Sequence, residues 1–361
     1  MPGGAAALPA AGEARSKLRA MSIQVGVVGL GYWGPNVARN LNAIDGAELR
    51  WCCELDPDRT ARWSPVFPTA RFTTDFEEML AEDELDAVAI TTPASDHAAL
   101  AGRALEAGKH CFVEKPLTHT TADAAELIRK AEEADRVLMV GHLLEYHPAI
   151  EALEAHVRSG ELGELTYVYS NRLNLGRLSE AENVLWDLGV HDLSVILRLV
   201  GELPSEVWAF GSRGVRDTVE DVVFAHLRFP SGLMAHMHLS WLDPHKERRV
   251  TVVGASRMAT FDDMASEGKL TIYDKGFDPD EASAGDFVAR SGAITKPAIS
   301  VKEPLRIEIE HWLECIAEGR RPRTDGHVGL RVVGVLEALQ ASLEADGERQ
   351  RVEPALSAPA G

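Results

Sequence analysis

The sequence predicts a two-domain fold in which an α/β domain with a parallel sheet precedes an α+β domain with a large open, mainly antiparallel sheet. Its 361 residues are about twice the length of a typical domain. From Ser22 onward, short apolar segments alternate with segments of helix length, an order typical of βαβ units. After Gly141 the pattern changes to long stretches of alternating polar and apolar residues, which is typical of antiparallel strands with one covered face.

The first domain is predicted to span residues 22–144. Apolar, β-branched runs predict its strands, and apolar residues three to four apart predict its helices. Ser95 is expected to cap a helix, because its hydroxyl can accept hydrogen bonds from the first-turn amides. In chain order the expected elements are strand 23–28, helix 35–43, strand 48–53, strand 86–91, helix 95–108, strand 110–113, helix 121–134 and strand 137–140.

The second domain is predicted to span residues 145–350. Pro230-Ser231-Gly232 predicts a hairpin turn between two of its strands. The stretch 275–300 has little periodicity and many small residues, so we expect a mobile loop there. The expected elements are helix 148–159, strands 165–173, 206–211, 219–229, 233–241, 249–253 and 258–261, and helices 304–318 and 326–344.

Composition limits the classes of partner. The chain has 37 Lys and Arg against 56 Asp and Glu, which gives a formal charge of −19. Such a surface repels nucleic-acid phosphates and anionic lipids, so we expect neither nucleic acid nor membrane as a partner. Apolar runs stay below the ~18 residues that span a bilayer. We therefore expect a cytoplasmic protein, with residues 1–21 as a disordered tail.

Cysteine and histidine spacing does not predict a metal site. The four cysteines form no C-x-x-C pair and no zinc spacing, so we expect reduced thiols in the core. His236 and His238 alternate on one strand face, but no third ligand stands at a fitting distance along the chain. Packing or hydrogen bonding explains these two histidines better.

A glycine-rich turn joins the first strand to the first helix. Its sequence, Gly29-Leu30-Gly31-Tyr32-Trp33-Gly34, has the G-x-G-x-x-G pattern of the Rossmann dinucleotide fingerprint. Glycines there permit a tight turn and close approach to a pyrophosphate, which then meets the amides at the helix start. We expect a nicotinamide dinucleotide site rather than a purely structural turn, formed by Gly29, Gly31, Tyr32, Trp33 and Gly34.

An acidic residue follows at the spacing that this cofactor requires. Glu54 lies 23 residues after Gly31, at the end of the second predicted strand. A carboxylate at this place can accept hydrogen bonds from the adenosine ribose and would repel a 2′-phosphate. The sequence therefore favours NAD over NADP, although Asp56 can also point to the ribose and Glu54 can equally be a surface residue.

Two further turns belong to the carboxyl edge of the predicted parallel sheet, where doubly wound folds bind their ligands. Thr92 and Pro93 close the third central strand, and His97 follows in the next helix. Glu114 and Lys115 directly follow strand 110–113. We expect the cofactor to contact Thr92, Pro93, His97 and Glu114, although packing explains His97 equally well.

The candidate proton-transfer groups are Lys115, Asp187 and His191. Asp187 and His191 are four residues apart in a helix predicted to begin near Val184, so they share one face. The carboxylate can orient the imidazole, and Lys115 or His191 can take the proton of a hydroxyl group that loses a hydride. A helix cap and a packed histidine are the structural alternative for this pair.

Three motifs together resemble the Gfo/Idh/MocA oxidoreductase family. They are the glycine-rich turn 29–34, Glu114-Lys115-Pro116 and the segment from Trp186 to Asp192. The resemblance covers the chain from Met21 to about Asp346. It implies an NAD-binding Rossmann domain before an open antiparallel sheet, catalytic roles for Lys115, Asp187 and His191, and a cis bond before Pro116.

The substrate region resembles the sugar-nucleotide branch of this family, in particular UDP-N-acetylglucosaminuronate 3-dehydrogenases. The likeness lies in segments 170–177 and 183–187. Arginine forks can clamp a diphosphate or a uronate, although solvated strand-end charges are the alternative. Asn171 stands where the branch has Gln, and His147 where it has Asn, which leaves the sugar open. The expected substrate-binding residues are Tyr146, Arg172, Asn174 and Arg177.

The expected function is NAD-dependent hydride transfer at a secondary alcohol, at carbon three of a nucleotide-linked sugar. One alternative is an inositol or free-sugar dehydrogenase. Another is an NADPH-dependent 3-ketoreductase of a deoxysugar nucleotide, and a third is a redox-silent NAD-binding sensor. We expect a homodimer or homotetramer, because an exposed sheet face would otherwise be a large apolar patch.

Overall fold

The structure is a computed structural model that describes residues 22–176, 178, 182–215, 217–279 and 286–353. The chain forms two compact units, the first comprising the residues up to Gly141 with Leu305–Gly329 and the second the remainder. The expected division at residue 145 leaves Leu305–Gly329 outside the first unit. In the structure, helix α9 (Pro304–Glu318) returns to that unit, where Trp312 packs against Phe112 with ring centroids 5.6 Å apart.

A six-stranded parallel sheet forms the centre of the first unit. Its order is β3-β2-β1-β4-β5-β6, so the winding reverses between β1 and β4, as in doubly wound folds. Both faces are covered, and β4 is buried along its whole length. The strands are β1 (Ile23–Val28), β2 (Ala47–Cys53), β3 (Arg71–Thr73), β4 (Ala87–Ile90), β5 (His110–Glu114) and β6 (Leu138–Gly141). The predicted α/β class is confirmed.

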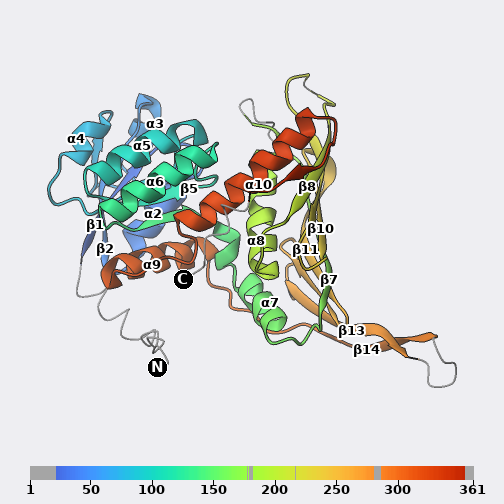
Figure 1. The fold of residues 1–361 in the computed structure, drawn as a ribbon. Coiled ribbons are helices and arrows are strands. Elements are labelled where there is room, and N and C mark those ends of the chain that lie inside the picture. The colour runs from blue at the N-terminus through green and yellow to red at the C-terminus, as the bar shows by residue number, and fades with distance from the viewer. Residues whose placement is uncertain (1–21, 177, 179–181, 216, 280–285, 354–361) are drawn as a thin grey trace, which may run out of the picture. The chain divides into compact units, whose positions relative to one another are not determined.

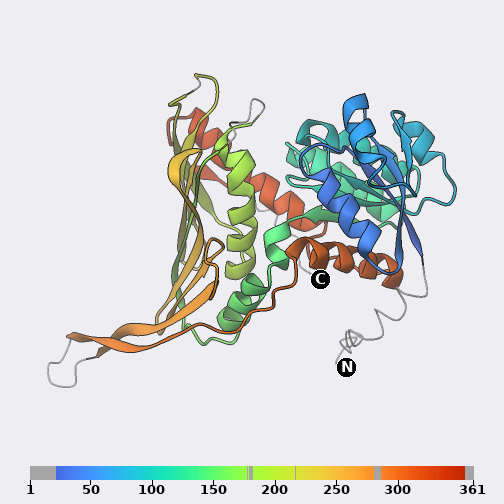
Figure 2. The same cartoon turned by 180° about the vertical axis from the view of Figure 1, so that it is seen from behind.

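Helices cover both faces of this sheet. Figures 1 and 2 show α5 and α6 on the face opposite to α2. The side chains of Asp56, Asp75 and Thr120 accept hydrogen bonds from first-turn amides. They therefore cap the N-termini of α3, α4 and α6. The helices are α2 (Gly34–Ala43), α3 (Pro57–Trp63), α4 (Phe76–Leu80), α5 (Ala94–Glu106) and α6 (Thr121–Glu133).

The predicted cap of α5 was wrong. The helix begins at Ala94, with Pro93 at the cap position and no capping side chain. Ser95 therefore lies inside the first turn, where its own amide is one of those that a cap would satisfy.

The second unit contains a nine-stranded sheet with the order β14-β13-β12-β11-β7-β10-β9-β8-β15. Neighbouring strands are antiparallel except for β10 and β7, so the predicted open, mainly antiparallel sheet is confirmed. The strands are β7 (Leu165–Leu175), β8 (Glu206–Ser212), β9 (Val222–Arg228), β10 (Met234–Ser240), β11 (Leu242–Gly254), β12 (Met258–Asp262), β13 (Leu270–Pro279), β14 (Phe287–Thr295) and β15 (Gln350–Arg351).

The expectation of a mobile loop at 275–300 was wrong for residues 275–279 and 287–295, while residues 280–285 lie outside the described part of the chain. Strands β13 and β14 pair there in a ladder from Ile272 with Thr295 to Pro279 with Phe287. Figure 1 shows this ribbon extending beyond the rest of the sheet. Because β14 is exposed on both sides, its sequence lacks the polar and apolar alternation by which a half-buried strand is recognised.

Helices cover one face of the nine-stranded sheet. The core beneath them includes Val195, Ile196 and Leu336, all fully buried. The opposite face, here called the open sheet face, carries Tyr167, Trp208, Phe224, His226, His236 and His238. The helical elements are η1 (Leu143–Tyr146), α7 (Pro148–Arg158), the π-helical turn η2 (Leu185–Gly189), α8 (Val190–Val200) and α10 (Gly326–Glu344), of which α10 enters the second unit at Leu330.

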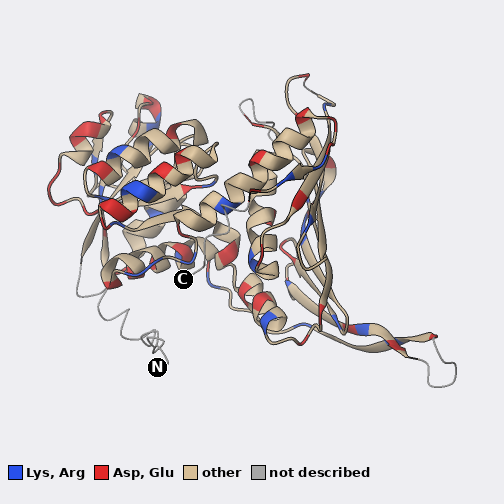
Figure 3. Ribbon diagram, viewed as in Figure 1, with Lys and Arg blue, Asp and Glu red and all other residues tan. Residues whose placement is uncertain are grey.

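Acidic residues are frequent on the helices of the first unit. Figure 3 colours Asp and Glu positions red along these helices. They include Glu77 and Glu78 of α4 and Glu126 and Glu133 of α6. Within the described residues, no helix combines the length and the apolar character needed to cross a bilayer. All four cysteines are buried thiols, as expected.

Candidate functional site

The glycine-rich turn forms a cradle that side chains would fill. Gly29 has a φ of +87°, a left-handed conformation that favours glycine. A Cβ at Gly34 would lie 1.9 Å from the Gly29 carbonyl oxygen, so the helix packs closely against the turn. At Gly31 a Cβ would meet only the guanidinium of Arg59, at 3.5 Å. The backbone there is open to close approach by a ligand.

The start of α2 suits a phosphate group. Trp33 provides no capping hydrogen bond, and no acidic residue occurs in the first turn. The amides and the positive end of the helix dipole are therefore available to an anion. Tyr32 is 89% exposed beside the turn, whereas Leu30 is fully buried and anchors it. These residues fit a dinucleotide pyrophosphate.

Thr91 holds the turn in place, a role that the sequence analysis did not assign to it. Its hydroxyl lies 2.9 Å from the Val28 carbonyl oxygen and 2.6 Å from that of Gly29. The residue directly follows β4, next to β1 in the sheet. The sequence feature that could have predicted this role is a hydroxyl residue directly after the strand that neighbours β1.

Glu54 anchors the same turn. Its Oε2 accepts from the Leu30 amide at 2.6 Å, and its Oε1 accepts from the Asp56 amide at 2.9 Å. The side chain is only 6% exposed, and the Arg59 guanidinium lies 3.7 Å from Oε2. Glu54 thus lies at the expected corner of the cradle, while its contact with a ribose remains a prediction.

His97 links two turns at the carboxyl edge of the sheet. Its Nδ1 lies 2.8 Å from the Pro116 carbonyl oxygen, and its Nε2 lies 3.0 Å from that of Thr92. The ring is 1% exposed. Both nitrogens face protein atoms, so His97 connects the Thr92–Pro93 turn to the peptide that follows Lys115. Cofactor contacts by Thr92 and Pro93 remain predictions.

Glu114 and Lys115 end β5 at the same edge of the sheet as the glycine turn. The Lys115–Pro116 bond is cis, as expected. Both side chains are half-buried, and the Lys115 amide donates to Glu114 Oε2 at 3.2 Å. Burial raises the pKa of the Glu114 carboxyl to about 7, although the Lys115 charge, that amide and a hydrogen bond from the Trp33 side chain oppose the rise.

Asp187 and His191 lie in a different helical geometry from the one predicted. The helix does not begin as a regular α-helix near Val184, because residues 185–189 form the π-helical turn η2. Such a turn bonds each residue to the fifth along, so a spacing of four no longer places side chains directly above one another. Asp187 Oδ2 accepts a hydrogen bond from the Trp241 indole at 3.1 Å, which fixes its carboxylate.

A network of hydrogen bonds within the second unit supports this turn. Asn183 donates from Nδ2 to Glu220 Oε2 and Gln340 Oε1, both at 2.9 Å. The Trp186 indole also donates to Gln340 Oε1, at 3.2 Å. Glu220, Gln340 and Trp241 were not identified from the sequence, because they come from segments distant from this turn.

Arg172 has a partner that the sequence analysis did not foresee. Its Nε and Nη2 both donate to Asp192 Oδ1, at 2.9 and 2.5 Å, and both residues are buried. The expected exposed fork for a substrate is therefore a buried ion pair between β7 and α8. Along β7, Arg172 lies on the same face as the buried Val168 and Ser170, and this alternation could have predicted its burial.

The other expected substrate residues differ in exposure. Tyr146 is fully buried at the end of η1. Asn174 is half-buried, and its amide occupies space that a Cβ at Gly176 would fill. Arg177 lies outside the described residues. Substrate contacts by these residues remain predictions.

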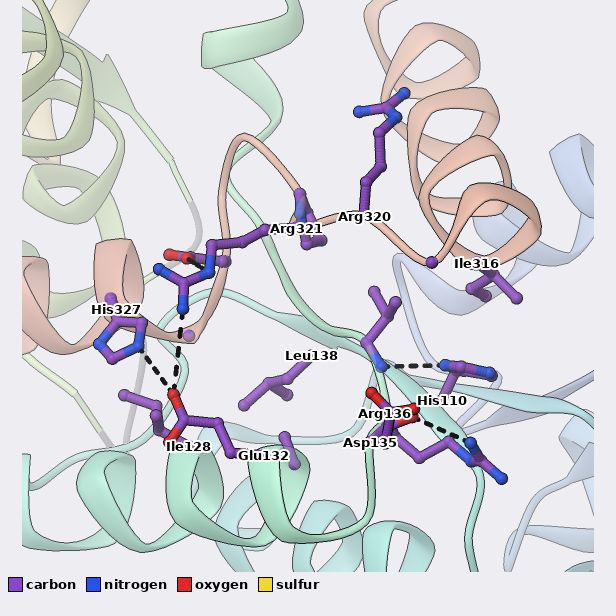
Figure 4. A pocket seen from close by; sticks show the side chains of 16 residues that line it. His110, Ile128, Glu132, Asp135, Arg136, Leu138, Ile316, Arg320, Arg321 and His327 are labelled. Carbon is purple, nitrogen blue, oxygen red and sulfur yellow. Dashed lines mark hydrogen bonds and ion pairs between the residues drawn. The ribbon is translucent and has the colours of Figure 1, made fainter. Parts of the chain in front are cut away.

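A cavity of about 460 Å³ lies in the first unit at the edge opposite to Lys115. His110 and Leu138 line it, and these residues begin β5 and β6 rather than end them. Figure 4 shows Arg321 and His327 directed toward Glu132, at 4.0 and 3.3 Å. This cavity is therefore separate from the cofactor cradle.

The histidines of the open sheet face pack against aromatic rings. His236 stacks on Tyr169 with centroids 5.5 Å apart, and His238 stacks on Phe224 at 4.4 Å. Packing is thus the observed role. Within the described ranges, no group of three or more His, Cys, Asp or Glu is arranged to hold a metal ion.

The chain is similar to known oxidoreductases over most of its length. Residues 23–142 match the model described as "Oxidoreductase family, NAD-binding Rossmann fold", and residues 150–260 match "GFO/IDH/MocA C-terminal domain". UDP-N-acetylglucosamine 3-dehydrogenase of Acidithiobacillus ferrooxidans is 31% identical over 325 residues, 90% of this chain and 98% of that protein. A solved structure of that dehydrogenase has a TM-score of 0.78 over 90% of this chain and 99% of its own. Inositol 2-dehydrogenase 2 of Paenarthrobacter aurescens is 28% identical over 346 residues, 92% and 99% of the two chains.

Proposed function

Because this chain belongs to the Gfo/Idh/MocA family of NAD(P)-dependent, sugar-related oxidoreductases, we propose that it oxidises a secondary alcohol of a nucleotide-linked sugar, at carbon three, with NAD. The observation that carries the proposal is the shared sheet edge of the glycine turn after β1 and Lys115 after β5. A base beside a dinucleotide cradle is what dehydrogenation requires.

The chemistry needs one proton acceptor. A bound nicotinamide ring supplies the hydride acceptor. As the hydride leaves the carbinol carbon, the hydroxyl proton passes to Lys115 or His191 and the carbonyl forms. The family's known activity disfavours a redox-silent sensor.

Asp187 is the proposed positioning group for His191. A carboxylate can select the imidazole tautomer and stabilise its protonated form. The hydrogen bond from Trp241 fixes the Asp187 carboxylate, which supports this role. A wider π-helical turn at this segment also agrees with it, since such turns occur often at functional sites.

The sugar-nucleotide assignment is supported by the relative at 31% identity, which is named as a dehydrogenase of UDP-N-acetylglucosamine. The sequence itself leaves the exact sugar open. Tyr146, Asn174 and Arg177 are proposed to bind the substrate. Arg172 is instead proposed to hold β7 and α8 together through Asp192. A second candidate is inositol or a free sugar, favoured by the inositol 2-dehydrogenase relative.

A cofactor-reduction screen tests the proposal. Purified full-length protein is mixed with NAD or NADP and with UDP-N-acetylglucosamine, UDP-uronates, TDP-sugars, inositols or free hexoses, and the near-ultraviolet absorbance of the reduced cofactor is followed. Reduction with a nucleotide sugar alone supports the proposal. Reduction with inositol or a free hexose alone assigns the second candidate. The reverse direction is tested by mixing the protein with NADH or NADPH and a 3-keto deoxysugar nucleotide and following the loss of the same absorbance.

The open sheet face is proposed as the contact between copies of this chain in a homodimer or homotetramer. Phe224 and Met234 are 46% and 40% exposed on it, and aromatic rings stack across its strands. Exposed apolar faces of this kind favour association. Light scattering should give a mass of two or four chains for the wild type, and Phe224→Glu should lower it; a monomeric wild type contradicts the proposal.

A further inference from the structure

Three charged side chains lie at the corner of the cradle where the adenosine ribose of a dinucleotide is expected. Asp56 Oδ2 is 3.2 Å from Nε of Arg59, and Glu54 Oε2 is 3.7 Å from its Nη1. The guanidinium also lies next to Gly31, 3.5 Å from the position of a Cβ there. Arg59 thus adjoins the turn that approaches the pyrophosphate.

The three side chains are held to different degrees. Both oxygens of Glu54 accept backbone amides, and the side chain is buried, so this carboxylate is fixed. Arg59 and Asp56 have 51% and 42% of their side-chain surface exposed, so the guanidinium can turn toward a ligand. Asp56 also caps α3, accepting from the Asp58 amide at 2.9 Å.

An arginine near the ribose is the usual partner of the 2′-phosphate of NADP. Here two carboxylates, those of Glu54 and Asp56, face the single guanidinium of Arg59. The Asp56 carboxylate is paired with Nε of Arg59. We propose that the Asp56–Arg59 pair determines cofactor choice: Asp56 holds Arg59 away from the 2′-phosphate, so Arg59 is a latent NADP ligand and the chain prefers NAD. This inference rests on the cofactor part of the proposed function and not on the sugar.

Binding titrations without substrate test the inference. The dissociation constants of NADH and NADPH are measured by nicotinamide fluorescence for the wild type, D56S, R59A and the double variant D56S/R59A. Serine removes the charge but still caps α3. D56N serves as a second variant, and circular dichroism checks the folding of each protein. The matched control is R62A, because Arg62 lies on the same helix over the Trp63 ring, 4.9 Å from its centroid.

The wild type should bind NADH more tightly than NADPH. D56S should lower the NADPH dissociation constant by ~10-fold or more, the effect of one charge-assisted hydrogen bond, and change that of NADH by less than ~3-fold. Adding R59A should abolish the gain, and R62A should alter neither constant.

Two results would overturn the inference. One is an unchanged preference in folded D56S and D56N. The other is a gain that persists in D56S/R59A, which would mean that removal of negative charge alone sets the preference. If neither dinucleotide binds the wild type, the cofactor proposal fails as well. If the expected pattern appears but no nucleotide sugar is oxidised, only the sugar assignment fails.

Discussion

The indole of Trp241 donates a hydrogen bond to the carboxylate of Asp187 over 3.1 Å. Trp241 directly follows β10, whereas Asp187 lies in the π-helical turn before α8. Trp241 is 1% exposed, and Asp187 is half-buried. The contact gives the proposed positioning carboxylate one defined orientation.

Replacing Trp241 by Phe should therefore lower kcat. The ring volume is largely kept while the donor is lost, and one hydrogen bond corresponds to ~2- to 10-fold in rate. The dissociation constant of NADH should stay the same. Trp208→Phe, on the open sheet face, is the control and should leave kcat unchanged. An equal loss of kcat in both variants would contradict the positioning role of Trp241.

The buried pair of Arg172 and Asp192 should contribute to stability only while both partners are present. Arg172→Met leaves a buried carboxylate without its partner, so the free energy of unfolding should fall by ~3–5 kcal/mol. The control is the partly exposed Arg249, which pairs with Asp262 at 3.3 Å and with Glu247 at 3.1 Å, and Arg249→Met should cost at most ~1 kcal/mol. Urea unfolding measures both values. A loss below ~1 kcal/mol for Arg172→Met would show that the pair does not hold β7 to α8.

Stability should depend on pH through Glu114. Its pKa is about 7 in the folded protein against 4.5 ordinarily, so the folded state retains the proton that the unfolded state releases. Relative to Glu114→Gln, the wild type should lose stability as pH rises from about 4.5 to about 7, and the difference should then stay constant. Urea midpoints across this range measure it. A difference that stays flat or has the opposite sign contradicts the raised pKa.

The cysteine thiols should not react in the native protein. Burial raises the pKa of Cys52 and Cys315 to about 12 and that of Cys53 to about 11, and it also raises the pKa of Cys111. Thiolate is the reactive form, so both access and ionisation are suppressed. A disulfide reagent should modify none of the thiols in buffer and all four in denaturant. Rapid native modification of any of them would contradict its burial.

The first unit could be predicted well because each of its signals is local. Both faces of β1 and β4 are covered, so they appear in the sequence as short, mostly apolar runs between helices. The turn from Gly29 to Gly34 needs glycine for steric reasons, so it can be recognised from a short sequence motif. Resemblance then added the role of Lys115, which composition alone cannot supply.

The remaining features depend on partners far apart in the chain. Arg172 looked like an exposed fork because Asp192, 20 residues away, could not be paired with it from spacing alone. The π-helical turn changes the geometry of Asp187 and His191 without an evident sequence signal. The β14 strand is exposed on both sides and so has no hydrophobic pattern.

Initial-rate measurements on Lys115→Ala and His191→Ala test the central claim most directly. Both variants and the wild type receive NAD and the nucleotide sugar that the screen identifies, and the dissociation constant of NADH is measured in parallel. The account predicts that substituting whichever of the two residues takes the proton lowers kcat by ~100-fold or more, the usual contribution of a general base, with NADH binding retained. Full turnover in both variants with intact NADH binding would contradict it.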